Sequence, residues 1–143
     1  SALIRLGGLD SLYAPFYWED IDLCYRARKS GLICLFEPDS VVDHYHETGA
    51  IKSHHGDFFI KTISYKNQFI FVWKNISDYF LLSQHLLWLP YHFLSALINK
   101  DWPFFFGFFK ATLQIPRLVI NYQQTESEFT ISDKEIFKKF EKQ

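Results

Sequence analysis

The sequence of 143 residues contains no methionine, not even at its first position. This absence predicts a fragment or processed piece of a longer protein. Two cysteines are too few for an ordinary disulfide framework. Cys24 and Cys34 have apolar neighbours, so we expect buried thiols in a reducing compartment. The start of the chain also lacks a basic region followed by an apolar core, so the sequence predicts no signal peptide.

Neither sign of charge dominates, because 15 Lys and Arg residues stand against 16 Asp and Glu residues. A nucleic-acid-binding domain would show a basic face, so we expect no nucleic acid as partner. Aromatic residues, in contrast, make up 20% of the chain and crowd into its second half. Tryptophan and tyrosine are favoured at membrane interfaces, which makes a membrane surface an expected partner.

The first part of the chain has the pattern of an α/β fold. Acids in the first turn, bases in the last turn and a terminal glycine predict a helix from about Asp20 to Ser30. The apolar run Leu32–Phe36 predicts a buried strand, and Ser40–His46 predicts a second one. Alternation along the second strand places His44 and His46 on the same face.

The second part is predicted to be helical. Apolar residues recur at helical spacing over residues 58–75. Tyr79–Asn99 carries no formal charge and is about long enough to span a bilayer. Its polar centre and Pro90 favour aromatic-rich helices that lie in the interface or enter it part way. A transmembrane helix and ordinary soluble packing of residues 79–120 stay open as alternatives.

A polar linker, Thr125–Thr130, precedes the end of the chain. Ser132 and Glu135 have the spacing of a capping box, which predicts a terminal helix from about Asp133 to Lys142. We therefore expect three parts: an α/β part (residues 1–56), a helical, membrane-associating part (57–122), and a linker with a terminal helix (123–143).

The strongest chemical signal is the acidic pair Glu19–Asp20, which follows Tyr17 and Trp18 at the start of a predicted helix. A carboxylate at such a junction is well placed to act as a general base. The alternative is that Asp20 only caps the helix. Asp22, one turn further, is expected to pair with Arg26 at i,i+4.

The run GGLDSLYAPFYWEDIDLCYRARKSG, followed by FEPDSVVDHYHETG, resembles the second half of the catalytic domain of family 2 glycosyltransferases. These inverting enzymes have the GT-A (Rossmann-like) fold and use nucleotide-activated sugars. The resemblance covers roughly Ala2 to Gly49. It implies that the chain holds the acceptor-side part of a GT-A domain, followed by amphipathic, aromatic-rich helices. It also implies a fragment of a hexosyl- or deoxyhexosyl-transferring enzyme that is inactive alone.

The resemblance assigns roles to several residues. Gly7 and Gly8 match the loop that borders the acceptor site. Asp20 matches the general base and Glu19 stands beside it, although the two roles could be exchanged. Tyr17 and Trp18 either stack on a sugar ring or anchor the loop in the core. His44, and next His46, match a histidine near the metal or the donor diphosphate, with a structural hydrogen-bonding role as the alternative. Arg26 and Arg28 either reach a phosphate or form a solvated helix end.

The family's nucleotide-binding half, with its Asp-x-Asp metal motif, is expected before Ser1. A divalent cation (Mg²⁺ or Mn²⁺) would therefore be bound mainly by that absent half. The implied partners are a nucleotide-sugar donor and a glycan or lipid-linked acceptor used in cell-surface polysaccharide synthesis. The implied location is the cytoplasmic face of a membrane, where the protein would be peripheral or monotopic.

Two other functions compete with glycosyl transfer. The first is a non-catalytic module for membrane docking or partner binding, derived from a glycosyltransferase. The second is a metal hydrolase built on His44, His46, His54 and His55. That reading has little support, since the sequence lacks a helical His-x-x-x-His pair and an obvious third ligand.

Overall fold

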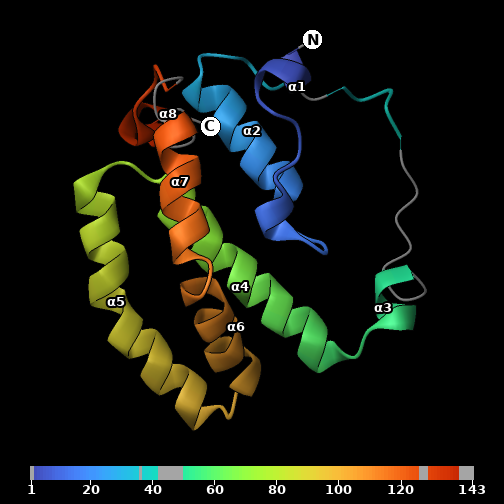
Figure 1. The fold of residues 1–143 in the computed structure, drawn as a ribbon, viewed down its shortest axis with the longest axis vertical. Helices are drawn as coiled ribbons and strands as arrows, with labels where there is room; N and C mark the ends of the chain where they lie inside the picture. Colours follow the sequence, from blue (N-terminus) through green and yellow to red (C-terminus); the bar gives the residue numbers. More distant parts are fainter. Residues whose placement is uncertain (1, 36, 42–49, 126–128, 139–143) are drawn as a thin grey trace.

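Eight α-helices and one 3₁₀ turn make up the regular structure of the computed structural model, which describes residues 2–35, 37–41, 50–125 and 129–138 (Figure 1). In chain order they are α1 (Ala2–Arg5), η1 (Ser11–Tyr13), α2 (Glu19–Lys29), α3 (Ala50–His54), α4 (Asp57–Asn75), α5 (Tyr79–Ile98), α6 (Trp102–Thr112), α7 (Ile115–Thr125) and α8 (Asp133–Lys138).

The predicted α/β, Rossmann-like fold is wrong, because the described residues form an all-helical fold without a strand. The described residues of the Leu32–Phe36 run are irregular, and Ile33 and Leu35 are 84% and 86% exposed. A strand needs a neighbour that pairs with its N–H and C=O groups. The described part offers none, so apolar composition alone does not make this run a strand. Most of the second predicted strand, from residue 42 onward, lies outside the described residues.

The helix predicted after the acidic pair is confirmed as α2. Its end has the hydrogen-bond pattern of a Schellman motif. The N–H of Leu32 donates to the carbonyl of Ala27 at 2.9 Å, and Gly31 between them has φ +79°. Glycine suits this position because it adopts a positive φ without a steric penalty.

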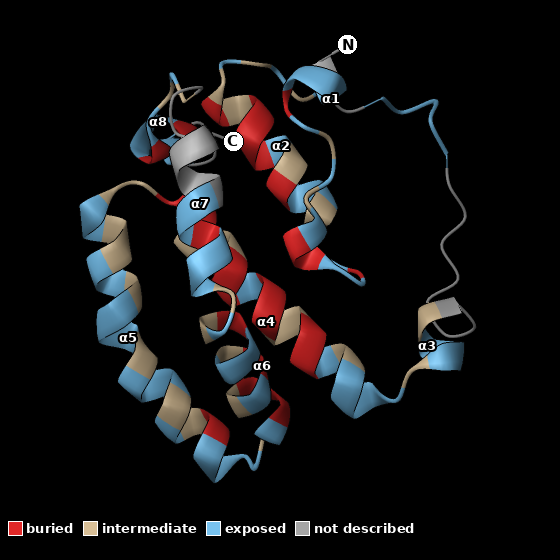
Figure 2. Ribbon diagram, viewed as in Figure 1, coloured by how far each residue is buried: buried red, intermediate tan, exposed pale blue. Residues whose placement is uncertain are grey.

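Helix α4 confirms the predicted helix over residues 58–75 and runs through the middle of the molecule (Figure 1). It packs against α6, α7, α2 and η1. Figure 2 shows buried residues along most of α4, in contrast to the largely exposed α5. The core joins Tyr13 of η1 to Ile70 of α4 and to Phe104 and Ala111 of α6. Tyr13 of the first predicted part therefore shares a core with α4 and α6 of the second, and the division into three parts stays a prediction.

Helix α6 lies very close to α4 at Gly107. A Cβ atom built on this glycine would stand 2.6 Å from the Cβ atom of Tyr65 and 2.9 Å from the carbonyl oxygen of Thr62. These distances are too short for two non-bonded atoms, so α4 and α6 can approach this closely only because Gly107 has no side chain.

Helix α8 begins with the predicted capping box. The Ser132 N–H donates to Oε2 of Glu135 at 2.9 Å, and the Glu135 N–H donates back to Oγ of Ser132 at 3.3 Å. Asp133 is buried and accepts hydrogen bonds from Lys29 Nζ and from the backbone N–H of Ser77, both at 2.8 Å. The terminal helix is therefore fixed to α2 and to the turn before α5.

Two further predictions concern the thiols and the membrane. Cys24 is exposed and Cys34 is half-buried, both as free thiols, so the expectation of buried thiols is wrong. Within the described ranges, every helix is too short or too polar to cross a bilayer.

Candidate functional site

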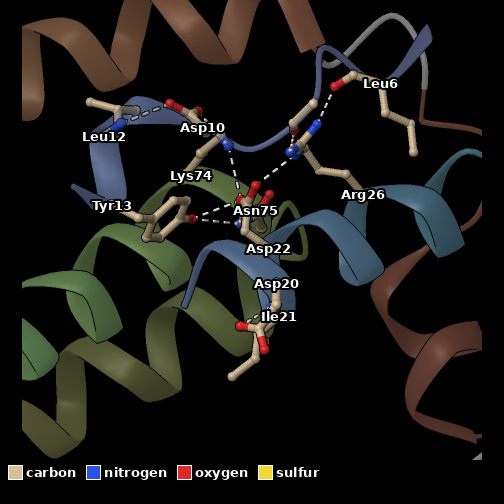
Figure 3. Close-up of polar contacts among 11 residues, drawn as sticks. Leu6, Asp10, Leu12, Tyr13, Asp20, Ile21, Asp22, Arg26, Lys74 and Asn75 are labelled. Atoms are coloured by element: carbon tan, nitrogen blue, oxygen red, sulfur yellow. Dashed lines mark hydrogen bonds and ion pairs between the residues drawn. The ribbon is translucent and has the colours of Figure 1, made fainter. Parts of the chain in front are cut away.

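The acidic pair lies where the loop after η1 turns into α2. Glu19 is the first residue of α2 and Asp20 the second, so the N-cap position belongs to Trp18. Asp20 is exposed, and its Oδ1 accepts a hydrogen bond of 2.8 Å from the N–H of Ile21. Asp20 is therefore not the N-cap residue, but its carboxylate does accept from a free N–H of the first turn, so the capping alternative stays open. Figure 3 shows Asp20 pointing away from the polar cluster behind it.

That polar cluster is centred on Asp22, whose side chain is 0% exposed (Figure 3). Its Oδ1 accepts hydrogen bonds from Tyr13 Oη at 2.7 Å, Asn75 Nδ2 at 2.8 Å and Lys74 Nζ at 2.9 Å. Its Oδ2 accepts from Arg26 Nε at 2.7 Å, which confirms the predicted i,i+4 pair. Burial alone would raise the pKa of Asp22, but Lys74 and Arg26 outweigh it and hold the pKa below its ordinary value. Asp22 is thus a structural carboxylate, not a group free to act on a substrate.

Arg26 connects this cluster to the Gly7–Gly8 loop. Its guanidinium donates to the carbonyl oxygen of Leu6, and its NH2 atom donates to that of Gly8 at 2.7 Å. Gly7 and Gly8 both have positive φ, +75° and +69°, which lets the loop turn back toward α2. Arg26 is buried, so it is neither a phosphate ligand nor the solvated helix end that its sequence position predicts.

Lysine and asparagine from α4 hold the loop on the other side of the acidic pair. Lys66 Nζ donates to the carbonyl oxygen of Ala14 at 2.7 Å. Asn67 Nδ2 lies 2.7, 2.8 and 2.9 Å from the carbonyl oxygens of Tyr13, Phe16 and Tyr17. Helical periodicity did not reveal that Lys66 and Asn67 bind the loop, because polar residues off the apolar stripe of a helix are ordinarily expected to face solvent. The pair stands in the polar run Lys66–Gln68, and Gln68 is exposed, so composition does not separate the buried residues from the exposed one.

Burial lowers the pKa of Lys66 to about 8, with Lys110 as a further cause. A lysine ammonium is rarely buried without a carboxylate partner. Here the backbone carbonyls of the loop take that place. The Lys66 side chain therefore positions the loop by donating hydrogen bonds to its carbonyl groups.

The two residues directly before the acidic pair have strained backbones. Tyr17 and Trp18 have φ of +71° and +75°, in the left-handed region that non-glycine residues rarely occupy. Asn67 binds the Tyr17 carbonyl, and the Trp18 carbonyl accepts a hydrogen bond of 2.8 Å from the N–H of Asp22. Such strain persists only where the surroundings enforce it, and it is concentrated at functional sites.

A cavity of about 220 Å³ lies beside the acidic pair. Asp10, Tyr13, Phe16 and Glu19 are among the residues that line it, so it joins the loop after Gly8 to the start of α2. The Oε2 atom of Glu19 is buried and has no hydrogen-bond partner among the described residues. An unpaired buried carboxylate oxygen is costly, which makes Glu19 a ready acceptor for a ligand hydroxyl.

The aromatic residues of the motif take different positions. Tyr17 is exposed, and its ring meets that of Phe16 edge-on at 4.9 Å. Trp18 is half-buried, its ring lies 5.4 Å from that of Phe71, and it packs against the core. Trp18 also borders a second cavity of about 370 Å³ between α4, α5 and α6. Trp18 therefore anchors the loop, whereas Tyr17 is the ring that is accessible from solvent.

The predicted metal or diphosphate ligands, His44 and His46, lie outside the described residues. Among the residues that are described, three or more His, Cys, Asp or Glu side chains nowhere come together as a metal site would require. The carboxylate of Asp22 is occupied by cationic side chains. The described residues thus do not form a binding site for a divalent cation.

Comparison with known proteins gives no family to which the chain can be assigned: family models, curated proteins and solved structures all failed to match it.

Proposed function

We propose that this chain belongs to a glycosyltransferase that moves a sugar, with inversion, from a nucleotide-sugar donor to a saccharide or lipid-linked acceptor. Asp20 would be the general base, with Glu19 and the loop after Gly8 beside the acceptor. The observation that carries the proposal is the contrast between neighbouring acids on α2. Asp22 is fully committed to internal hydrogen bonds, while Asp20 is exposed and Glu19, which lines the cavity, has an oxygen without a hydrogen-bond partner among the described residues.

The way in which the acidic pair is held also supports this function. Arg26 fixes the glycine loop from α2, and Asn67 fixes the strained residues before Glu19 from α4. A general base must be placed within hydrogen-bond reach of the proton that it abstracts. A loop fastened from two helices supplies that positional constraint, and a simple helix cap would not need it.

In the proposed reaction, a hydroxyl oxygen of the acceptor attacks the anomeric carbon while a carboxylate oxygen of Asp20 takes the hydroxyl proton. The new carbon–oxygen bond forms on the face opposite the departing group. The bond between the anomeric carbon and the phosphate oxygen breaks, and the nucleoside diphosphate leaves with the electron pair. Glu19 accepts a hydrogen bond from the acceptor. The proposal includes a divalent cation that residues outside the described part would mainly bind.

The test is an assay for nucleoside diphosphate release and product formation, with a panel of nucleotide sugars and the enzyme that contains this chain. Asp20→Asn should lower turnover by about 100-fold or more, as expected for loss of a general base, while donor binding is retained. Glu19→Gln separates the two roles, because the larger loss identifies the base.

Stability gives the control for that assay. Asp20 is exposed, so Asp20→Asn should change the free energy of unfolding by less than about 0.5 kcal/mol. Turnover equal to wild type in both Asp20→Asn and Glu19→Gln would exclude this catalytic site. The non-catalytic module described above would then become the better explanation.

A further inference from the structure

Helix α5 packs against the core through Leu89, Phe93 and Ala96, and polar residues lie beside them. His85, His92, Ser95 and Asn99 recur at helical spacing, and all four line the cavity of about 370 Å³ between α4, α5 and α6. In a helix on the surface of a water-soluble domain, the apolar stripe normally faces the core. Ala96 is the one residue of α5 that is fully buried. Helix α5 departs from this pattern because apolar residues lie on its outer side as well as against the core.

The opposite side of α5 is apolar and exposed. We define the outer face of α5 by five residues whose spacing places them on one stripe: Phe80, Leu87, Tyr91, Leu94 and Ile98. Leu87 is 78% exposed and Ile98 is 71% exposed. Figure 2 shows α5 as exposed along most of its length. Exposed apolar surface of this extent marks an interaction site.

The width of the apolar surface favours lipid over another helix. Tyr79, Leu86 and Leu97 are also exposed and flank the outer face. At 3.6 residues per turn, the combined surface covers an arc of about 140°. A helical partner buries a narrower seam and is usually bordered by charged side chains. Here the residues from 79 to 99 carry no formal charge at all.

Two polar residues of α5, Ser83 in the arc and Gln84 at its edge, are exposed. Ser83 lies in the arc, and its hydroxyl donates to the carbonyl of Phe80 at 2.8 Å, so it is already satisfied. Trp88 borders the arc, and its ring meets the ring of Tyr91 edge-on at 5.5 Å. Tryptophan and tyrosine side chains are characteristic of the boundary between acyl chains and headgroups.

The net charge of the segment from Tyr79 to Thr125 favours a membrane that contains anionic lipids. Between Tyr79 and Thr125 the only charged residues are Lys100, Asp101, Lys110 and Arg117, so three bases and one acid give a net charge of 3 − 1 = +2. All three bases are exposed. Asp101 is half-buried and accepts a hydrogen bond from the Tyr65 hydroxyl. The helices from α5 to α7 therefore present positive charge to their surroundings, which complements anionic lipid headgroups.

From the width of the exposed apolar arc and the exposed bases together, we propose that the outer face of α5 lies on a membrane surface that contains anionic lipids. The helix would lie in the plane of the interface, with its apolar side chains among the acyl chains. This inference does not depend on the proposed catalytic activity, since none of the residues of the outer face belongs to the acidic-pair site.

The direct test is co-sedimentation of the 143-residue chain with vesicles of phosphatidylcholine alone or mixed with phosphatidylglycerol. We expect stronger binding to the mixed vesicles. The variant Leu87→Glu/Leu94→Glu should bind at least about tenfold more weakly, because two apolar contacts are replaced by charges. The matched control is Ile33→Glu/Leu35→Glu, which makes the same kind of change at two exposed positions outside α5. It should bind almost as wild type does.

Equal loss of binding in both double variants, or unchanged binding of Leu87→Glu/Leu94→Glu, would overturn the proposal. So would a wild-type chain that binds neither kind of vesicle. Sedimentation velocity identifies the competing occupant. A stable dimer that Leu87→Glu/Leu94→Glu converts to monomer, without vesicle binding by wild type, would show that a second copy covers this face.

A second measurement does not require the double variant to fold. Vesicles that carry bromine on their acyl chains quench tryptophans that enter the bilayer. We expect this quenching to fall in Trp88→Phe, at the border of the outer face. It should persist in Trp73→Phe, because Trp73 is half-buried and its Nε1 lies 3.2 Å from Nε2 of His85. Undiminished quenching in Trp88→Phe would contradict an α5 that rests on lipid.

Discussion

The carboxylate of Asp22 and the ammonium group of Lys74 lie 2.9 Å apart, although 52 positions separate the two residues in the chain. Lys74 also lies 2.7 Å from the carboxylate of Asp10. Both side chains of the Asp22–Lys74 pair are almost completely buried. The helix that carries the acidic pair is thereby fastened to the end of α4 by opposite charges inside the molecule.

Removing the charge of Asp22 should strongly destabilise the folded protein. Breaking one partner of a buried ion pair typically costs about 3–5 kcal/mol, because the remaining charge is left uncompensated. We expect Asp22→Asn to lower the free energy of unfolding by about that amount, as measured by urea denaturation. Asp20→Asn, two residues away on the exposed side, is the matched control. Equal stability of the two variants would contradict the structural role of Asp22.

Stability should fall in acid for the same reason. The pKa values of Asp22 and Asp133 are held below their ordinary value of 3.8, chiefly because the cations Lys74 and Lys29 outweigh the effect of burial. Below about pH 4 the unfolded chain therefore binds protons that the folded chain does not. Above that pH the contribution of these groups to the free energy of unfolding should be constant, and it should decrease as the pH falls further.

Urea denaturation at several pH values between about 2 and 6 checks this expectation. Asp22→Asn removes one of the two linked carboxylates, so its stability should depend less steeply on pH in the acidic range. A slope identical to that of wild type would show that Asp22 is not linked to the acid transition.

The sequence predicted the local features well. The helix α2, its glycine cap, the Asp22–Arg26 pair, the helix α4 and the capping box of α8 all follow from spacings of five residues or fewer, or from a single period. These interactions depend on neighbours in the chain, which any sequence shows directly.

The long-range features could not be predicted in this way. The strand assigned to Leu32–Phe36 depended on a partner strand, and the described part of the chain has none. Periodicity did not reveal that Lys66 and Lys74 of α4 are buried against residues 10–22. A helix in the middle of a small fold is covered on more than one side, and the sequence alone does not reveal by which segments.

Asn67 should be the most sensitive residue of the loop before the acidic pair. Asn67→Leu would leave the carbonyls of Tyr13, Phe16 and Tyr17 without this donor, and each buried unsatisfied group costs about 1–3 kcal/mol. We expect a loss of stability of about 2–4 kcal/mol and faster amide exchange from Tyr13 to Trp18.

Gln68→Leu is the control for that experiment, since Gln68 is the exposed neighbour of Asn67 on the same helix. It should change stability by less than about 0.5 kcal/mol. If Asn67→Leu proved as mild as Gln68→Leu, the hydrogen bonds from α4 would not be what holds the loop.

Gly107 offers a test of the contact between α4 and α6. Gly107→Ala places a methyl group where Tyr65 and Thr62 already lie within 3 Å. We expect a loss of stability of about 1–3 kcal/mol, as for other overpacked cores. Gly56→Ala is the matched control, because a Cβ atom there meets nothing within 4 Å. It should cost less than about 1 kcal/mol. Thermal denaturation of the two variants would distinguish these cases.

The buried carboxylate of Asp133 has a geometric consequence. It binds Lys29 at the last residue of α2 and the N–H groups of Ser77 and Asp78, immediately before α5. The end of α2 and the residues just before α5 are thus held together by a single carboxylate. Because α2 begins at the acidic pair, Asp133 helps to fix where Asp20 lies relative to α5. On the proposed membrane surface, a residue remote from both reactants and lipid would thereby influence how far an acceptor must project from the bilayer to be reached.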